Sequence, residues 1–183
     1  KFLEDKILAT LALIVLAPVM ILVAIAIKLE SPGPVLFRQN RLGFNNRTFK
    51  LLKFRSMKAS DHVEVVTVQA TPNDERVTRV GRFIRRTSID ELPQLWCVLR
   101  GDMSLVGPRP ALPLEVGQYS LEERGRLDAK PGITCTWQVS GRSDIPFDEQ
   151  VVLDVDYIRD QSVKNDLKLL VKTVQAVITG RGA

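Results

Sequence analysis

The most prominent feature of the hydropathy pattern is a long apolar run near the start of the chain. From Ile7 to Ile27 there are 21 residues without a charge, and only Thr10 and Pro18 fall outside the apolar set. As a helix, this run is about 31 Å long, enough for the hydrocarbon core of a bilayer. A helix packed in a soluble core would keep a polar face, which this run lacks. The pattern therefore predicts a membrane segment.

Pro18 lies near the middle of the run and predicts a break, because proline removes a backbone donor inside a helix. Cations flank both ends, so the positive-inside rule gives no direction across the bilayer. They are Lys1 and Lys6 on one side and Lys28, Arg38 and Arg41 on the other. Two topologies stay open on the residues alone: a re-entrant hairpin with both ends on the cytoplasmic face, and a single kinked span. A buried helix and a cleaved signal peptide fit less well.

Shorter patterns follow the breaker cluster Ser31-Pro32-Gly33-Pro34. Apolar residues alternate in Val35 to Arg38 and in Phe49 to Phe54, with Gly43 to Asn46 between them, which predicts a β-hairpin. Positions 28 to 58 hold eight cationic residues and one acidic residue, so this piece should face anions. A nucleotide or nucleic acid could supply them, but the neighbouring membrane segment favours a phospholipid surface.

The remaining patterns are weaker. Residues 59 to 75 are polar around a Val-rich stretch and predict a loop or edge strand, and we assign the sole histidine, His62, no role. Arginines recur at helical spacing from Arg76 to Arg86, as in a basic stripe. A C-terminal amphipathic helix, able to pack on the domain or to lie among lipid headgroups, is predicted by Leu167, Leu170, Val171, Val174 and Val177.

Composition narrows the class of protein. The chain has 183 residues, 45% of them hydrophobic, and a formal charge of +5, which excludes a disordered or fibrous protein. Cys97 and Cys135 cannot form a disulfide framework and match no zinc spacing, so we expect a reducing compartment. We find no repeat and no glycine-rich phosphate loop. We expect a membrane segment at residues 1–30 and one domain at 31–183. The start at Lys1 without a methionine suggests missing upstream residues, but the sequence does not decide whether any precede it.

The stretch with the most chemical information runs from Thr87 to Leu95 and is followed by Gly101 to Pro110. On the residues alone, Ser88 with Glu91 three positions later is a capping box, and acids in the first turn complement a helix dipole. That structural interpretation competes with a catalytic role for the Asp90-Glu91 pair.

Six ordered segments resemble the bacterial sugar transferase family. They are FKLLKFRSM at 49–57, RVGRFIRRTSIDELPQ at 79–94, GDMSLVGPRP at 101–110, KPGIT at 130–134, WQVSGR at 137–142 and the stretch 153–167. Members of this family are monotopic polyprenyl-phosphate phosphoglycosyl transferases, which begin the assembly of exopolysaccharide, O-antigen and glycoprotein glycans. The resemblance covers nearly the whole chain.

The resemblance implies transfer of a sugar 1-phosphate from a UDP-sugar to a polyprenyl phosphate such as undecaprenyl phosphate, with release of UMP. It assigns Asp90 as the residue that forms a covalent phosphosugar intermediate, and Glu91 as the partner that helps to hold Mg²⁺. Arg85 and Arg109 match the arginines of the phosphate site. Lys53 matches a further phosphate-binding position, and Asp154 is another active-site candidate.

The resemblance also implies a fold and a location. We expect a mainly α fold with a small β-hairpin: a re-entrant helix-break-helix at Pro18, then one compact cytoplasmic α+β catalytic domain with amphipathic interfacial helices. This places the chain on the cytoplasmic face of the bacterial inner membrane, with membrane lipid and no nucleic acid as partners and a homo-oligomer left open. The segment at 137–142 is similar to members handling galactose or glucose. Ala17, Cys97 and Cys135 stand where Ser, Asn and Gly are typical, and Phe2 stands where a basic residue is usual.

Two other interpretations remain beside the enzyme. The first is a membrane-anchored basic module that binds anionic lipid or nucleic acid through residues 28 to 58. The second is an inactive relative that keeps the fold, which the changes at Cys97 and Cys135 suggest and the intact Asp90 and Glu91 oppose.

Overall fold

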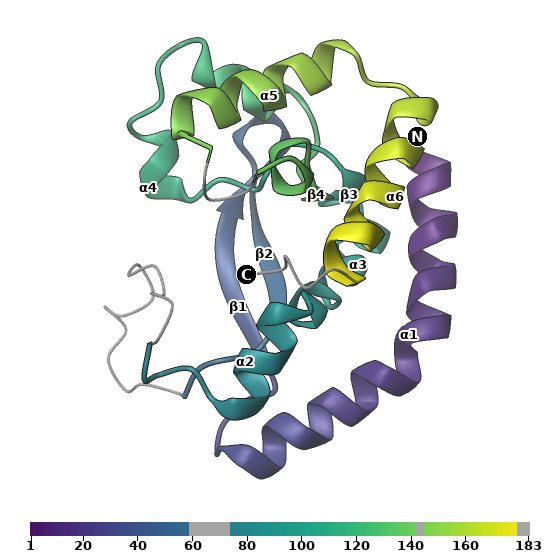
Figure 1. Ribbon diagram of the computed structural model, residues 1–183. Coiled ribbons are helices and arrows are strands. Elements are labelled where there is room, and N and C mark those ends of the chain that lie inside the picture. The colour runs from purple at the N-terminus through teal and green to yellow at the C-terminus, as the bar shows by residue number, and fades with distance from the viewer. Residues whose placement is uncertain (59–73, 142–144, 179–183) are drawn as a thin grey trace.

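The computed structural model describes residues 1–58, 74–141 and 145–178, and within these ranges the chain is mainly helical with two small sheets (Figure 1). The helices are α1 (Phe2–Glu30), α2 (Arg79–Arg86), α3 (Gln94–Arg100), α4 (Pro113–Val116), α5 (Phe147–Arg159) and α6 (Val163–Ile178). The 3₁₀ turns are η1 (Phe44–Asn46), η3 (Ile89–Glu91), η4 (Glu123–Asp128) and η5 (Trp137–Val139). Strands β1 (Leu36–Leu42) and β2 (Thr48–Phe54) pair antiparallel, and β3 (Ser104–Val106) and β4 (Gly132–Thr134) pair parallel. Most of the predicted loop at 59–75, His62 included, lies outside the described residues.

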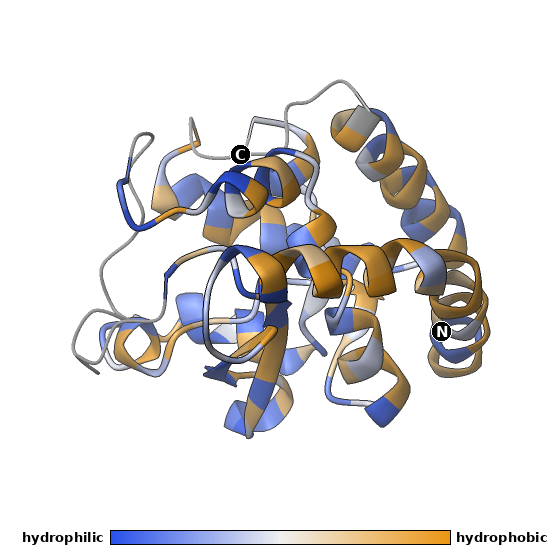
Figure 2. Cartoon of the chain, turned by 90° about the horizontal axis from the view of Figure 1, so that it is seen from below, coloured by the Kyte–Doolittle hydropathy of each residue, from blue (hydrophilic) through white to orange (hydrophobic). Residues whose placement is uncertain are grey.

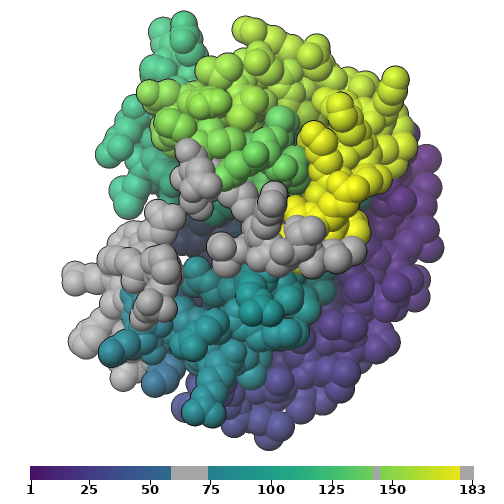
Figure 3. Space-filling view, viewed as in Figure 1, coloured from purple at the N-terminus to yellow at the C-terminus, as the bar shows by residue number. Residues whose placement is uncertain are grey.

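Helix α1 confirms the predicted apolar helix. Among the described helices it is the one long and apolar enough to cross a membrane. It runs along one side of the molecule, is coloured mostly as hydrophobic, and changes direction along its length (Figures 1, 2 and 3). Pro18 lies inside it. Ala9 and Ile27 are buried against the rest of the protein, whereas Ile14 and Val15 are exposed. Its outer side is thus apolar, and its path relative to a bilayer stays a prediction.

Hydrogen bonds join the C-terminal end of α1 to both the hairpin and α2. Buried Arg55, which directly follows β2, donates to the main-chain oxygen of Ser31 at 2.7 Å and to its hydroxyl at 2.9 Å. The Glu30 carboxylate accepts from the main-chain N–H groups of Arg79 at 2.7 Å and Val80 at 3.0 Å. Helix ends need such partners because their first amides and last carbonyls have none inside the helix. The end of α1 and the start of α2 are therefore fixed together.

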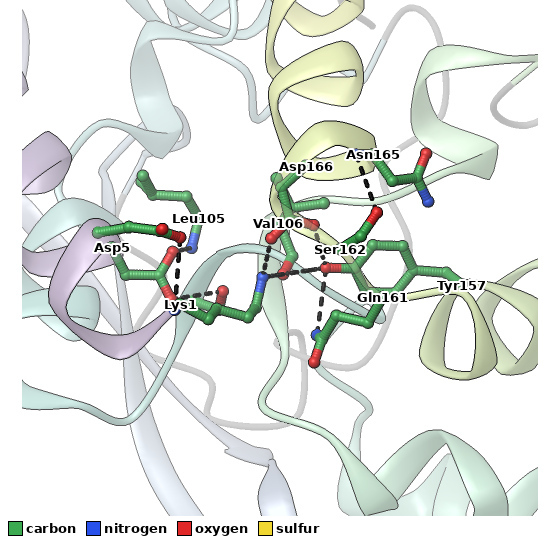
Figure 4. Close-up of polar contacts among 11 residues, drawn as sticks. Lys1, Asp5, Leu105, Val106, Tyr157, Gln161, Ser162, Asn165 and Asp166 are labelled. Carbon is green, nitrogen blue, oxygen red and sulfur yellow. Dashed lines mark hydrogen bonds and ion pairs between the residues drawn. The ribbon is translucent and has the colours of Figure 1, made fainter.

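The other end of α1 is held by a polar cluster between α5, α6 and β3 (Figure 4). The Lys1 ammonium donates to the Tyr157 hydroxyl at 3.0 Å and pairs with the Asp166 carboxylate. Tyr157 in turn donates to Asp166 at 2.6 Å. One turn later, Asp5 accepts from the Ser104 hydroxyl at 2.8 Å. Both ends of α1 are thus attached to the rest of the protein.

The predicted hairpin is confirmed, and β1 continues to Leu42 instead of ending at Arg38. Its turn contains Asn45 and Asn46 at φ 53° and 60°, in the left-handed region that asparagine tolerates better than most residues. Side chains alternate between the two faces of β2. Leu51 and Lys53 line one pocket, whereas Lys50 and Leu52 line a groove beside α1.

A buried ion pair connects η4 with α5. Asp154 is fully buried, and Arg126 donates to its Oδ2 from Nε at 3.0 Å and from Nη2 at 2.7 Å. The guanidinium lies 5.8 Å from the ring centre of Tyr119. A buried carboxylate is tolerated when a well-oriented cation compensates for the lost hydration.

The predicted C-terminal amphipathic helix is confirmed as α6, but its apolar residues divide between two sides. Leu169 is buried and Leu170 is half-buried against the core. Leu167, Val171 and Val174 are each more than half exposed. Packing on the domain therefore accounts for only part of the apolar face.

Candidate active site

The Asp90-Glu91 pair lies in the three-residue turn η3, between the end of α2 and the start of α3. The predicted capping box is wrong. Ser88 adopts φ 54° and ψ 15°, in the left-handed region, and its side chain makes no capping hydrogen bond. An N-cap serine needs an extended backbone to point its oxygen at the following amides. The acidic pair therefore does not open an α-helix; α3 begins later, after Pro93.

Lys53 and Glu91 form the central ion pair of the site. The Lys53 Nζ lies 2.6 Å from Glu91 Oε1, and both side chains are less than a quarter exposed. Lys53 comes from β2, so the contact attaches the dyad turn to the hairpin. The structure thus brings the predicted phosphate-binding lysine directly to the predicted dyad.

Asp90 lies half-buried beside this pair. The pKa of Asp90 is raised to about 6, mainly by burial and also by the negative charge of Glu91, against the opposing effects of Lys53 and Arg85. Burial disfavours the charged form of a carboxylate, and neighbouring cations favour it. Asp90 is still mostly ionised at neutral pH. The predicted Arg85, in the last turn of α2, is therefore close enough to act on Asp90.

An open pocket next to the dyad turn has a cationic wall. Three cationic side chains and one carboxylate line it: Arg41, Lys53, Arg109 and Glu91. Leu51, Gln94, Pro110, Gly132, Ile133 and Gln138 complete the lining. The Arg109 guanidinium lies 5.6 Å from the centre of the Trp137 ring, within reach of a cation–π contact. The structure therefore gathers the predicted Lys53, Glu91 and Arg109 around one space.

Arg41 is the pocket cation that sequence reasoning did not assign to the site, since it was counted as a flank of the membrane segment. Its position follows from the hairpin register. Arg41 pairs with Phe49, and Gln39 with Leu51, so these residues share the face that carries Lys53. Alternation along a correctly registered hairpin could have placed it there.

Asp154 is not among the residues that line the pocket. Burial raises the pKa of Asp154, and Arg126, Trp137 and the main chain of Arg109 act against that rise. Trp137 is also the ring beside the Arg109 guanidinium. The buried carboxylate is therefore close to the segment that carries Arg109, and its assignment to the active site stays a prediction.

The carboxylates of the site suit a metal that shares its ligands with a substrate. No group of three or more His, Cys, Asp or Glu side chains able to hold a metal occurs among the described residues. Mg²⁺ is often bound by only one or two carboxylates together with substrate phosphates. Glu91 and its neighbour Asp90 can supply such a partial set.

The two cysteines are buried and unpaired. Burial raises the pKa of both thiols, which disfavours their reactive thiolate form. Cys135, where the resemblance led us to expect a glycine, is not among the described residues with positive φ. This position therefore does not need a glycine, and the local backbone accommodates the cysteine.

Known proteins match this sequence over nearly its whole length. The UDP-glucose:undecaprenyl-phosphate glucose-1-phosphate transferase of Escherichia coli K12 is 48% identical over 179 residues, which are 93% of this chain and 38% of that protein. The galactosyl transferase CpsE of Streptococcus agalactiae is 47% identical, covering 82% of this chain and 36% of the relative. The exopolysaccharide production protein ExoY of Sinorhizobium fredii is 38% identical, covering 98% of this chain and 85% of the relative.

The chain thus spans less than half the length of the first two relatives and most of the third. The family profile described as "Bacterial sugar transferase" matches residues 1–180. The expected resemblance is confirmed, and this chain belongs to the bacterial sugar transferase family.

Proposed function

We propose that this chain transfers a sugar 1-phosphate from a UDP-sugar to a polyprenyl phosphate such as undecaprenyl phosphate, through a covalent phosphosugar on Asp90. The observation that carries the proposal is the convergence of Lys53, Arg85 and Arg109 on the dyad turn and its pocket. Relatives named as undecaprenyl-phosphate glucose-1-phosphate transferases support the substrate class.

In the first step, the Asp90 carboxylate attacks the sugar-bearing phosphorus of the donor. A bond from Asp90 oxygen to phosphorus forms, the bond to the bridging oxygen breaks, and UMP leaves with that electron pair. Asp90 needs no general base because it is ionised at neutral pH. Two unit charges about 4 Å apart repel by roughly 4 kcal/mol at an effective dielectric constant near 20, so the attack depends on nearby cations. Lys53 and Arg85 are suitably close.

In the second step, a phosphate oxygen of the lipid attacks the same phosphorus. The bond to Asp90 breaks, the carboxylate is restored, and a polyprenyl-diphosphate sugar leaves. Splitting the transfer in this way lets both half-reactions use the cations beside Asp90, Lys53 and Arg85, and implies ping-pong kinetics. The product would start exopolysaccharide or related glycan assembly.

Glu91 is the residue that would hold Mg²⁺ in this proposal. When bound, the ion supplies positive charge beside the donor diphosphate. Glu91 also orients the Lys53 ammonium through their 2.6 Å contact. We expect EDTA to stop transfer and added Mg²⁺ to restore it; an unchanged rate in EDTA would remove magnesium from the proposal.

We place the catalytic domain at the cytoplasmic face of the bacterial inner membrane, with α1 as a re-entrant hairpin. A soluble donor and a lipid acceptor meet only at such an interface. Glucose and galactose are the sugars that we favour, because relatives named for each are nearly equally similar. The competing function, passive binding of anionic lipid through the basic hairpin, needs no pocket.

Changing the dyad should abolish chemistry without abolishing membrane binding. We expect Asp90→Asn and Glu91→Gln each to lower turnover of UDP-glucose and undecaprenyl phosphate by at least about a thousandfold, because each removes a charge from the reacting centre. Mass spectrometry of wild-type protein mixed with donor alone should find the phosphosugar on Asp90.

The matched control is Asp148→Asn, an exposed carboxylate at the start of α5 that should turn over like the wild type. Full turnover by Asp90→Asn would overturn the mechanism. Equal lipid binding by all variants, with no transfer by any of them, would favour the passive module.

The Asp90 carboxylate should lower the free energy of unfolding at neutral pH. The pKa of Asp90 is about 6 in the folded protein and about 4 in an unfolded chain, so the folded state binds the proton more tightly. The penalty is therefore fully present above pH 6, and stability should rise as the pH falls from about 6 to about 4. We expect Asp90→Asn to unfold at a higher temperature than the wild type at pH 7.5, by about 1–3 kcal/mol of unfolding free energy, with the difference vanishing near pH 4.

Thermal unfolding in detergent with EDTA measures this effect. Asp148→Asn should show no such gain over the wild type. A wild type that exceeds Asp90→Asn in stability at pH 7.5 would show that its cations more than compensate for burial.

The topology can be decided at the two ends of α1. Leu3 and Leu29 are both strongly exposed, so Leu3→Cys and Leu29→Cys each offer a reactive thiol. The native Cys97 and Cys135 are buried and should stay silent. A re-entrant hairpin predicts that both new cysteines are labelled only from the cytoplasmic side, by a membrane-impermeant maleimide on sealed inverted and right-side-out vesicles. Labelling of the two from opposite sides would show a span.

A further inference from the structure

Arg41 is held in the pocket by neutral groups. Its Nε and Nη2 donate to the side-chain oxygen of Gln39 at 3.1 and 2.8 Å, and its Nη1 donates to the main-chain oxygen of Pro110 at 3.0 Å. These bonds fix the plane of the guanidinium but leave its charge uncompensated. A guanidinium has five N–H donors, so further donors remain for a ligand.

Arg109 faces the same space with the same sign of charge. None of the ion pairs formed among the described residues includes Arg41 or Arg109. Burial and the charge of Arg109 lower the pKa of Arg41 to about 10, and the opposing effects of Glu115 and Glu91 come from beyond ion-pair distance. Two partly buried cations without a carboxylate between them lose hydration and repel each other. An anion bound between them would relieve both costs.

The cations of the site form two groups. Lys53 and Arg85 are the ones that act on Asp90. Arg109 is the one that acts on Arg41. Glu91 belongs to both surroundings, because it pairs with Lys53 and also influences Arg41. The contacts agree with this division, because Arg41 donates to the main-chain oxygen of Pro110, the residue after Arg109, whereas Lys53 pairs with Glu91 of the dyad turn. The pocket therefore has a dyad end and an Arg41–Arg109 end.

A diphosphate fits this arrangement better than a single phosphate. The pocket wall carries three cationic side chains and one carboxylate, a net charge of +2 that matches the two negative charges of a nucleotide sugar diphosphate. If Asp90 attacks one phosphorus at the dyad end, the other phosphate extends toward the opposite end.

Resting on the proposed function, we propose that Arg41 and Arg109 together bind the phosphate that stays on the nucleotide and leaves as UMP. Arg41 is then a residue of the donor half-reaction and takes no part in transfer to the lipid. Its planar donors suit the bidentate recognition of phosphate oxygens.

Equilibrium titration with UMP and with uridine tests the phosphate contact directly. We expect Arg41→Gln to weaken UMP binding by roughly 10- to 100-fold and to leave uridine binding unchanged. Arg41→Lys should lie between, because it keeps the charge but loses the fork of donors. The control is Arg38→Gln, an exposed arginine of β1 on the opposite face, which should bind UMP like the wild type.

Kinetics separate this role from a general effect on the fold. In a ping-pong reaction, kcat/KM for each substrate reports its own half-reaction, so Arg41→Gln should lower the value for the UDP-sugar and leave the value for the lipid phosphate unchanged. Equal losses for UMP and uridine, or for both substrates, would assign Arg41 a structural role and overturn the inference. If the wild type is active and Arg41→Gln binds UMP as tightly as the wild type, only the role of Arg41 is overturned. If the wild type forms no phosphosugar, the proposed function itself is overturned.

Discussion

The candidate site depends on the contact between Lys53 and Glu91. The turn η3 is only three residues long and places two carboxylates next to each other, without support from a serine cap. A cation on a paired strand compensates for one of them. This lets Asp90, the other carboxylate, keep a pKa near 6 although it is partly withdrawn from water, so that it is charged at the pH of a cell. A longer or shorter hairpin would move the lysine away from the turn.

The position of η3 is set by the C-terminal end of α1. Arg55 binds the backbone just after α1, and Glu30 binds the first amides of α2. Helix α2 has eight residues, about 12 Å, and its last turn carries Arg85 toward Asp90. Gly81 allows this course, because a Cβ there would lie 1.9 Å from the main-chain oxygen of Ser56. The distance from the apolar helix to the dyad is thus defined by rigid elements and leaves little freedom to loops.

The elements that could be predicted from the sequence are those determined by the local pattern of apolar and polar residues. The apolar helix, the hairpin and the C-terminal amphipathic helix were all predicted, as each is encoded in neighbouring residues. The prediction of a capping box at Ser88 was wrong because a serine caps a helix only when its backbone is extended. After the end of α2, Ser88 instead adopts the left-handed conformation. The exposed side of α6 could not be predicted, since burial depends on which distant elements pack against it.

The site residues follow the same division. The dyad, Arg85, Arg109 and Lys53 were assigned through motifs, and the structure gathers them. Arg41 was missed because a charge run hides which of its members point inward, and only the strand register reveals it. The burial of Asp154 depends on Arg126, 28 residues away, and on no pattern near either residue.

The proposed chemistry explains why the pocket carries charges that weaken the fold. If every cation of the pocket were already paired with a carboxylate, binding a diphosphate would not stabilise them further. Here Arg41 and Arg109 repel each other, and a donor that brings two negative charges relieves this repulsion. Asp90 is ionised at a cost in hydration, which Lys53 and Arg85 limit. In the proposed reaction, transfer to Asp90 then separates the two phosphates. One stays at the dyad end as a covalent adduct, and the other, no longer tethered, is held only by the arginine pair. Its departure leaves the cations at the dyad end beside the adduct for the lipid phosphate to use.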